Sequence, residues 1–234
     1  MAIKILKENE EGFGIIIDRE AGCISTELNR SLNENAQVLD LTKPVYYFAT
    51  LQKFGVENRN GRVYPEEILR REVEKYREVI RKNASFHELD HPQESVISLK
   101  GGSPHRIVDL FWKDNVLIGK LEILISEGYR KSGIISCNGD LVAHYLSYGM
   151  TLGISSRGVG SLKKVGGKNE VQDDFELICW DIVSSPSTPG SYLYKNAEDF
   201  AKYDEASPES EPAMATGNDR KDEFLNNLSK FLQK

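Results

Sequence analysis

The sequence predicts an α+β domain that is mainly β, with a few helices. Three observations lead to this fold class. Runs rich in strand-forming residues recur along the chain, four of them can be paired across short turns, and only two amphipathic helical patterns interrupt them. The chain has 234 residues, of which 39% are hydrophobic and 28% charged, which is the composition of an ordinary globular protein. A chain of this length can bury a hydrophobic core without disulfides or a structural metal.

The first half of the domain contains one strand, one helix and one hairpin. Residues 45–51 are dense in β-branched and aromatic side chains, which predicts a strand. Residues 65–82 predict a helix, because a proline occupies the first helical position, acidic residues follow it and basic residues fill the last turn. Residues 107–112 and 116–125 predict two strands that turn at 113–115.

The second half contains another helix and another pair of strands. Residues 140–148 predict a helix that Gly149 ends. Residues 151–164 and 171–183 predict two strands around a glycine-rich turn at 166–169.

The C-terminal part has a different composition from residues 1–203, which we expect to form the domain. Residues 204–218 contain prolines and acidic residues but almost no large apolar side chain, which predicts a disordered linker. Residues 219–234 place phenylalanines and leucines on one helical face, which predicts an amphipathic helix. This helix either docks on a partner or folds back on its own domain.

Charge, hydropathy and cysteine content exclude several classes of protein. The net charge of −6 comes almost entirely from residues 204–219, so the domain has no basic face that would favour nucleic acid. No run of 18 apolar residues predicts a membrane span, and the N-terminus lacks the features of a secretory signal. Three widely spaced cysteines predict a reducing compartment and no disulfide framework.

Residues 87–91 match the zinc-peptidase pattern H-E-x-x-H, in which His87 and His91 would hold the metal and Glu88 would act as base. The pattern has this meaning only on a helix. Pro92 disfavours a helical conformation at His91, and no third ligand occurs at a familiar spacing. We therefore expect no metal and no other cofactor, and keep a zinc peptidase as an alternative.

Two further segments contain candidate catalytic residues. In residues 153–160, glycines surround Ser155 and Ser156, and their N–H groups could face an oxyanion. Asp181 interrupts an otherwise apolar strand, where a carboxylate requires a donor such as an imidazolium. Together with His91 these residues supply a nucleophile, a base and a group that orients the base, as in acyl transfer.

Four motifs in order resemble those of the prohead core proteases of T-even-like tailed phages, a family related to the herpesvirus assemblins. The motifs are NRNGRVYP (58–65), ELDHP (88–92), GISSRGVG (153–160) and DIVSSPS (181–187). The resemblance covers about residues 45–195. It implies an assemblin-like β-barrel flanked by helices, and a serine endopeptidase that needs no cofactor.

The resemblance also implies a site and a biological setting. It suggests Ser155 as nucleophile, His91 as base and Asp181 as third member. The expected substrates are scaffold core and major capsid proteins, cut after glutamate in Leu/Ile-x-Glu contexts inside the assembling prohead in the host cytoplasm. Autoprocessing is also expected, and residues 6–8 and 125–127 fit the cleavage pattern.

Several alternatives stay open at this stage. Ser156 is the rival nucleophile and Glu88 the rival third member. Backbone N–H groups near Arg157 and Gly158, or near Ser187, are alternative oxyanion donors, and Arg157 is also a candidate for binding an acidic substrate side chain. A homo-oligomer is kept as one of these alternatives. A non-enzymatic scaffold or capsid-interaction protein with the same fold is a further alternative.

Overall fold

The computed structural model describes residues 13–17, 39–92 and 95–195. The predicted linker (204–218), the predicted C-terminal helix (219–234) and the candidate cleavage site at residues 6–8 lie outside these residues. The elements in chain order are β1 (Phe13–Ile17), β2 (Val45–Lys53), β3 (Arg62–Val63), α2 (Glu66–Arg81), β4 (His105–Lys113), β5 (Val116–Ile123), α3 (Glu127–Ser132), α4 (Asn138–Ser147), β6 (Gly153–Val165), β7 (Lys168–Val171), β8 (Glu176–Val183) and β9 (Leu193–Tyr194).

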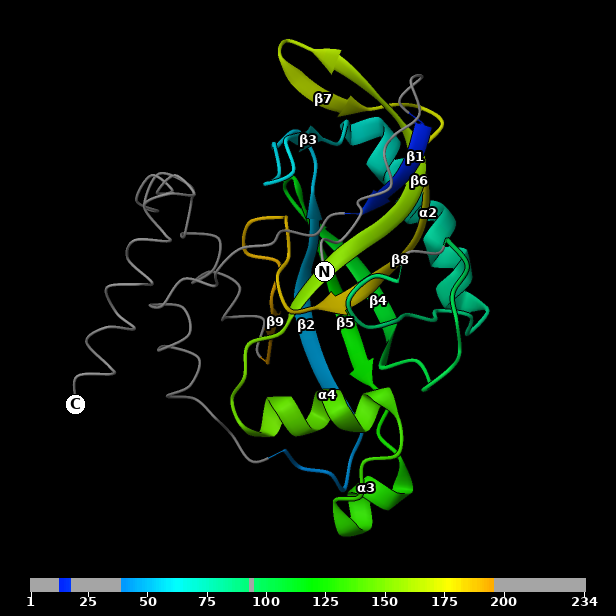
Figure 1. Ribbon diagram of the computed structural model, residues 1–234, viewed down its shortest axis with the longest axis vertical. Coiled ribbons are helices and arrows are strands. Elements are labelled where there is room, and N and C mark those ends of the chain that lie inside the picture. The colour runs from blue at the N-terminus through cyan, green and yellow to red at the C-terminus, as the bar shows by residue number, and fades with distance from the viewer. Residues whose placement is uncertain (1–12, 18–38, 93–94, 196–234) are drawn as a thin grey trace, which may run out of the picture.

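The described strands form two sheets. The first has the order β1-β6-β7-β3, with β8 also paired to β6, and the second has the order β4-β5-β2-β9. The first half of β6 pairs with β8, and its far end pairs with β7 in a hairpin that extends from one end of the molecule (Figure 1). Residues 191–194 join the sheets, because Ile154 N donates to Ser191 O while β9 pairs with β2. The mainly β class is therefore confirmed, but the described strands do not close into a barrel.

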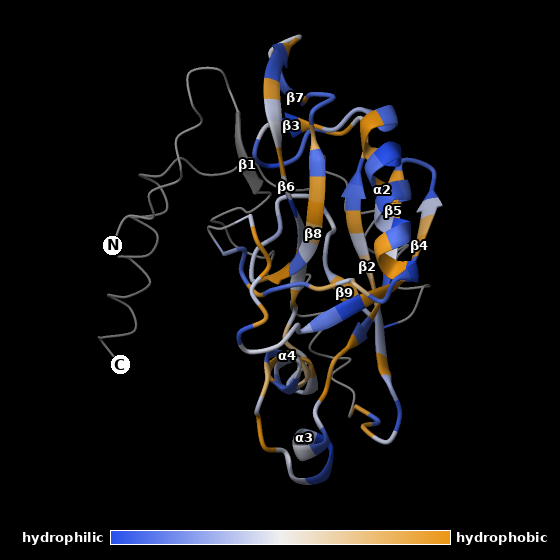
Figure 2. Ribbon diagram, turned by 90° about the vertical axis from the view of Figure 1, so that its right-hand side faces the viewer, coloured by the Kyte–Doolittle hydropathy of each residue, from blue (hydrophilic) through white to orange (hydrophobic). Residues whose placement is uncertain are grey.

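Apolar residues of both sheets and of the helices meet in one main core. Ala49 and Leu51 of β2, Leu121 of β5, and Ile154 and Trp180 of the other sheet are fully buried in it. Helix α2 flanks the sheets and α4 lies across one end of them, with α3 beyond it (Figures 1 and 2). Within the described residues, no helix combines the length and apolar character needed to cross a membrane.

Most of the predicted elements are present with shifted ends. The strand predicted at 45–51, the helix at 65–82, the hairpin turning at 113–115 and the helix at 140–148 are confirmed as β2, α2, β4–β5 and α4. The single strand predicted at 171–183 is wrong, because a turn at 172–175 divides it into β7 and β8. Phe175 N donates to Gln172 O in this turn, and Ser161 N donates to Asp174 Oδ1.

Candidate functional site

Strand β8 separates two different environments because its side chains alternate between its faces. Trp180 and Ile182 belong to the core, so Cys179 and Asp181 lie on the opposite face. Ser155 of β6 is directly opposite Asp181, and Ser156 is directly opposite Trp180. Cross-strand partners share a face, with Cβ atoms about 5 Å apart. The register therefore places Ser155 beside Asp181 and Ser156 on the core face.

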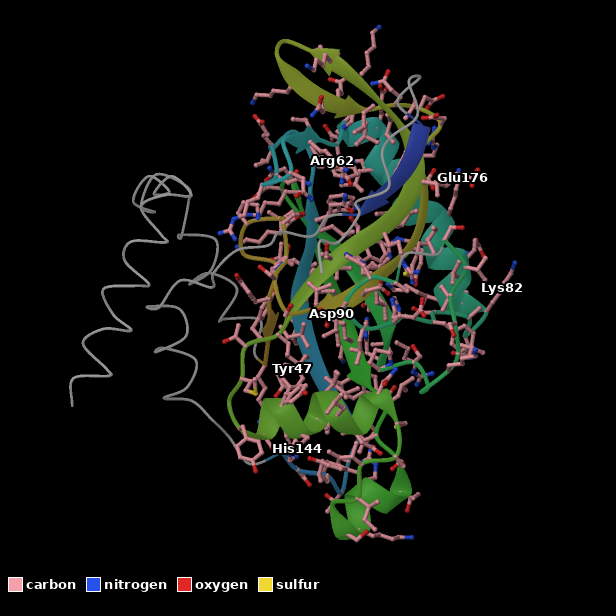
Figure 3. The ribbon with its side chains drawn as sticks, in the orientation of Figure 1. Tyr47, Arg62, Lys82, Asp90, His144 and Glu176 are labelled. Atoms are coloured by element: carbon pink, nitrogen blue, oxygen red, sulfur yellow. The ribbon has the colours of Figure 1, made fainter. Side chains whose placement is uncertain are left out.

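The segment that carries the candidate histidine lies along the other edge of β8. Leu89 forms a parallel bridge with Ile182, and Asp90 N donates to Ile182 O at 2.9 Å. Asp90 and His91 then adopt φ angles of 53° and 47°. Left-handed conformations are uncommon outside glycine and often occur at functional sites. Ser184 N donates to Asp90 Oδ1 at 3.1 Å and supports this turn, which lies beside the end of β8 in the middle of the molecule (Figure 3).

This turn brings the imidazole of His91 onto Asp181. His91 Nδ1 lies 2.7 Å from Asp181 Oδ2, and both side chains are buried. His91 Nε2 is also buried and makes no hydrogen bond to a described residue. Ser155 is only 2% exposed. The structure therefore brings His91 and Asp181 into contact and places Ser155 next to Asp181 on the adjoining strand.

The carboxylate of Asp181 is surrounded by donors. Oδ1 accepts from Glu88 N at 2.8 Å and from Cys179 Sγ at 3.2 Å. Oδ2 lies 2.9 Å from Arg157 Nε in addition to its contact with His91. Burial alone raises the pKa of Asp181, but the hydrogen bond and charge of His91 and the charge of Arg157 outweigh it and hold the pKa below its ordinary value. Asp181 is thus an ionised carboxylate in a buried site.

Arg157 and Glu88 differ from their sequence-based interpretations. The Arg157 side chain is fully buried, with Nη2 2.6 Å from Glu88 Oε2 and Nε on Asp181. Its guanidinium is committed to internal carboxylates, so the expectation that Arg157 binds a substrate side chain is not supported. Glu88 contacts Arg157 with its side chain, whereas the carboxylate in contact with His91 is that of Asp181.

The candidate oxyanion residues are also distinguished by the structure. Arg157 and Gly158 lie within β6, which has β8 on one side and β1 on the other, and the register with β8 shifts between these two residues. A Cβ on Gly158 would lie 2.5 Å from Phe175 Cε2, which gives this glycine a packing role. Ser187 is fully buried in the loop after β8, and its Oγ has no hydrogen-bond partner among the described residues.

The H-E-x-x-H segment does not have the conformation that zinc binding requires, because residues 84–92 form no helix. His87 points into the core instead. Its Nδ1 accepts from Trp180 N at 3.3 Å, its Nε2 lies 2.8 Å from Ser85 Oγ, and its ring stacks on His105 with a centroid separation of 4.1 Å. Nowhere in the described part of the chain do three or more His, Cys, Asp or Glu side chains form a metal-binding group.

Sequence reasoning missed the cluster of Glu88, Arg157 and Cys179 around Asp181. The available signal was an arginine among small and apolar residues in a predicted strand, since buried charges require partners. It also missed His105, which lies in the core against His87. No pattern of spacing links these residues, because β-pairing rather than local sequence brings them together.

Comparison with known proteins adds independent information to this geometry. A profile of the family described as "Prohead core protein serine protease" matches residues 14–199. This chain belongs to that family. It is 31% identical over 159 residues to the prohead core protein protease of Enterobacteria phage T4, which covers 66% of this chain and 70% of the relative.

A solved structure supports the same relationship. The structure of the bacteriophage T4 capsid assembly protease matches with a TM-score of 0.53 and 28% identity, covering 59% of this chain and 80% of that one. The resemblance stated from the four motifs is therefore confirmed. Family membership supports a peptidase, and the cluster around Asp181 lies within the matched residues.

Proposed function

We propose that this protein is a serine endopeptidase of phage prohead maturation in which Ser155, His91 and Asp181 form the catalytic triad. His91 Nε2 accepts the proton of Ser155 Oγ as that oxygen attacks the peptide carbonyl carbon. The C–N bond then breaks, and His91 gives the proton to the leaving amine. Water, deprotonated by His91, hydrolyses the resulting ester and restores Ser155.

The observation that carries this proposal is the 2.7 Å contact between His91 Nδ1 and Asp181 Oδ2, with Ser155 opposite Asp181 in the sheet. The contact fixes the proton on Nδ1 and leaves Nε2 as the basic nitrogen, as a general base requires. Because Ser155 and Ser156 face opposite sides of β6, the register favours Ser155. Catalytic hydrogen bonds often tighten only when substrate binds, so we expect Ser155 Oγ to approach Nε2 in the complex.

We assign the oxyanion hole to the loop at Ser187 and Thr188. This loop is anchored close to the site, because Pro186 packs on Gly153 and Ser187 O accepts from Arg59 N at 3.1 Å. The Ser187 hydroxyl lacks a described partner and could donate to the oxyanion together with neighbouring backbone N–H groups.

We propose scaffold core and major capsid proteins as substrates, with cleavage after glutamate in Leu/Ile-x-Glu contexts inside the prohead in the host cytoplasm. For autoprocessing we favour Glu8 of Leu6-Lys7-Glu8 over Glu127. Ser126 caps α3 and its N–H donates to Asp140 Oδ1 at 2.7 Å, so cleavage after Glu127 would require local unfolding. We propose that the predicted helix at 219–234 directs the protein to the scaffold core. A chain truncated after residue 203 tests this, because it should then fail to be encapsidated.

The deciding experiment uses the full chain and a synthetic peptide of its residues 1–14, with a Glu8→Gln peptide as control. Wild-type protein should cleave the first peptide after Glu8 and leave the second intact. Ser155→Ala should lower kcat by several orders of magnitude with the fold retained, whereas Ser156→Ala should lower it far less.

Other outcomes would select the alternatives. Undiminished cleavage by Ser155→Ala would end the serine assignment, and sensitivity to a chelator in that variant would select a metallopeptidase. If neither the peptide nor a purified scaffold protein is cut, a non-enzymatic role in assembly is the better description.

A further inference from the structure

The face of β8 that carries Asp181 contains three charged groups in contact. The side chains of Arg157 and Asp181 are completely buried, and that of Glu88 is only 12% exposed. A buried charge is costly unless it is paired, and removing one member of such a group leaves the others uncompensated. The cluster of one cation and two carboxylates therefore carries a net charge of −1 next to His91.

We propose that Arg157, held by Glu88, is a positioning residue that keeps Asp181 ionised and directs its Oδ2 at His91 Nδ1. The inference rests on the proposed triad, because it assigns a role to the groups behind Asp181. It replaces the sequence-based expectation that Arg157 contacts the substrate.

The geometry of the guanidinium supports this role. Arg157 Nε lies 2.9 Å from Asp181 Oδ2, and Nη2 lies 3.4 Å from Oδ1, so one rigid planar group contacts both carboxylate oxygens. The Nη2 contact is a hydrogen bond, and together with the bond from Glu88 N it holds Oδ1, while the delocalised charge at Nε lies beside Oδ2. Ser155 and Arg157 are two residues apart on one face of β6, so the nucleophile and this cation share one rigid element.

Glu88 connects this pair to the segment that bears His91. Its side-chain Oε2 lies 2.6 Å from Arg157 Nη2, while its backbone N–H donates to Asp181 Oδ1 at 2.8 Å. Glu88 is three residues before His91, so its two contacts hold the histidine segment against both β6 and β8. The cluster of Glu88, Arg157 and Asp181 thus ties together the three segments that carry the triad.

The first experiment measures the charge effect without requiring activity. In a Ser155→Ala background, the titration of the Asp181 carboxyl carbon is followed by ¹³C NMR. Arg157→Met should raise the pKa of Asp181 by about one pH unit or more, because an opposite charge is lost. Glu88→Gln should lower it, because a like charge is lost, and the double variant should fall between the two.

Shifts of opposite sign, with compensation in the double variant, are not expected from a purely structural defect. An Asp181 titration that is the same in wild type and Arg157→Met would overturn the proposal. If Arg157→Met does not fold, Arg157→Gln carries the same test, and an Asp181 titration that is unchanged in that variant would overturn the proposal equally.

The second experiment measures activity with Ser155 intact on the peptide of residues 1–14. Arg157→Met should lower kcat by 10- to 100-fold with little change in KM. As the pH is lowered, the activity of Arg157→Met should begin to fall at a higher pH than the activity of the wild type. Arg157→Lys should recover part of kcat. Arg71→Met removes an arginine that pairs with Glu72 outside the site and serves as the control.

The two experiments separate the two proposals. Cleavage that survives Ser155→Ala would overturn the proposed function whatever the NMR result. Arg157→Met could instead lower kcat without changing the acid side of the pH–activity profile or the titration of Asp181. That result would overturn the positioning role of Arg157 and leave the proposed triad standing.

Discussion

His87 and His91 are four residues apart, yet they lie on opposite faces of β8 in opposite environments. His87 stacks on His105 in the core and accepts a hydrogen bond from the backbone of Trp180. His91 contacts the ionised carboxylate of Asp181 on the other face. The intervening segment runs along the edge of β8 and turns sharply at Asp90.

This difference shows that the role of a histidine is set by its partners rather than by its motif. Burial lowers the pKa of His87 to about 4, although the charge of Asp181 opposes the shift, so His87 is neutral at pH 7. His91 has a carboxylate behind it, which stabilises the positive charge that a general base acquires. One pentapeptide thus supplies one core residue and one candidate base.

The largest predicted effect is the contrast between matched substitutions of the two histidines. His91→Gln should reduce cleavage of the residues 1–14 peptide by about 10⁴-fold, because the proposed general base is lost. His87→Gln should retain most of kcat per folded molecule but unfold at lower denaturant. Peptide kinetics and urea unfolding of both variants measure the contrast, and it fails if His87→Gln is the more damaging to kcat.

The sequence predicted those elements whose signals are local. Helix α2 was found because Pro65 precedes it and Ile68, Leu69 and Val73 form one apolar face. The division between β7 and β8 was missed because apolar residues on both sides concealed the turn. Asp173 and Asp174, which are poor strand formers, were the signal that could have revealed it.

The candidate site was predictable only in part, because its members come from distant segments. Motif order indicated His91, Ser155 and Asp181, and their placement around β8 supports the proposal. The environment of Arg157 could not be predicted, since it depends on Glu88 reaching it from 69 positions away. Pairing across the sheet, rather than spacing along the chain, determines which charges meet.

The next effect concerns the stability of the core face in acid. Burial lowers the pKa of His87 to about 4 and holds that of His105 well below its ordinary value, so both rings are neutral in the fold. The unfolded chain binds protons at these residues near pH 6.5. The free energy of unfolding should therefore fall as the pH drops below 6.5 towards 4, by about 1.4 kcal/mol per pH unit for one such group.

Urea unfolding between pH 7 and pH 5 measures this dependence. Asp140 and Asp181 also have lowered pKa values, so their contribution is lost mainly at lower pH. His105→Phe should reduce the slope, and His144→Gln, on helix α4, serves as the control. An unchanged slope in His105→Phe would contradict this account of the core histidines.

A smaller effect is expected at Ser85, which supports the core histidine. Its Oγ lies 2.8 Å from His87 Nε2 and 3.1 Å from Tyr76 Oη, and it accepts from Ile107 N at 3.2 Å. Ser85→Ala leaves these buried groups without that partner, which should cost about 1–3 kcal/mol of stability. Ser132→Ala, an exposed serine on α3, is the control, and kcat should be the same in both variants.

The smallest predicted effect is at Asp90, which supports the candidate base as Ser85 supports the core histidine. Asp90 combines a left-handed φ with a side chain that accepts from Ser184 N. Asp90→Asn should be nearly neutral, because asparagine tolerates this conformation and keeps an acceptor oxygen. Asp90→Ala loses the acceptor and keeps the strain, so it should cost about 1 kcal/mol and lower kcat several-fold as His91 becomes less well placed. Asp90→Gly relieves the strain but also lacks the acceptor. If the kcat of Asp90→Gly equals that of Asp90→Asn, then the backbone conformation, rather than the bond to Ser184, places His91.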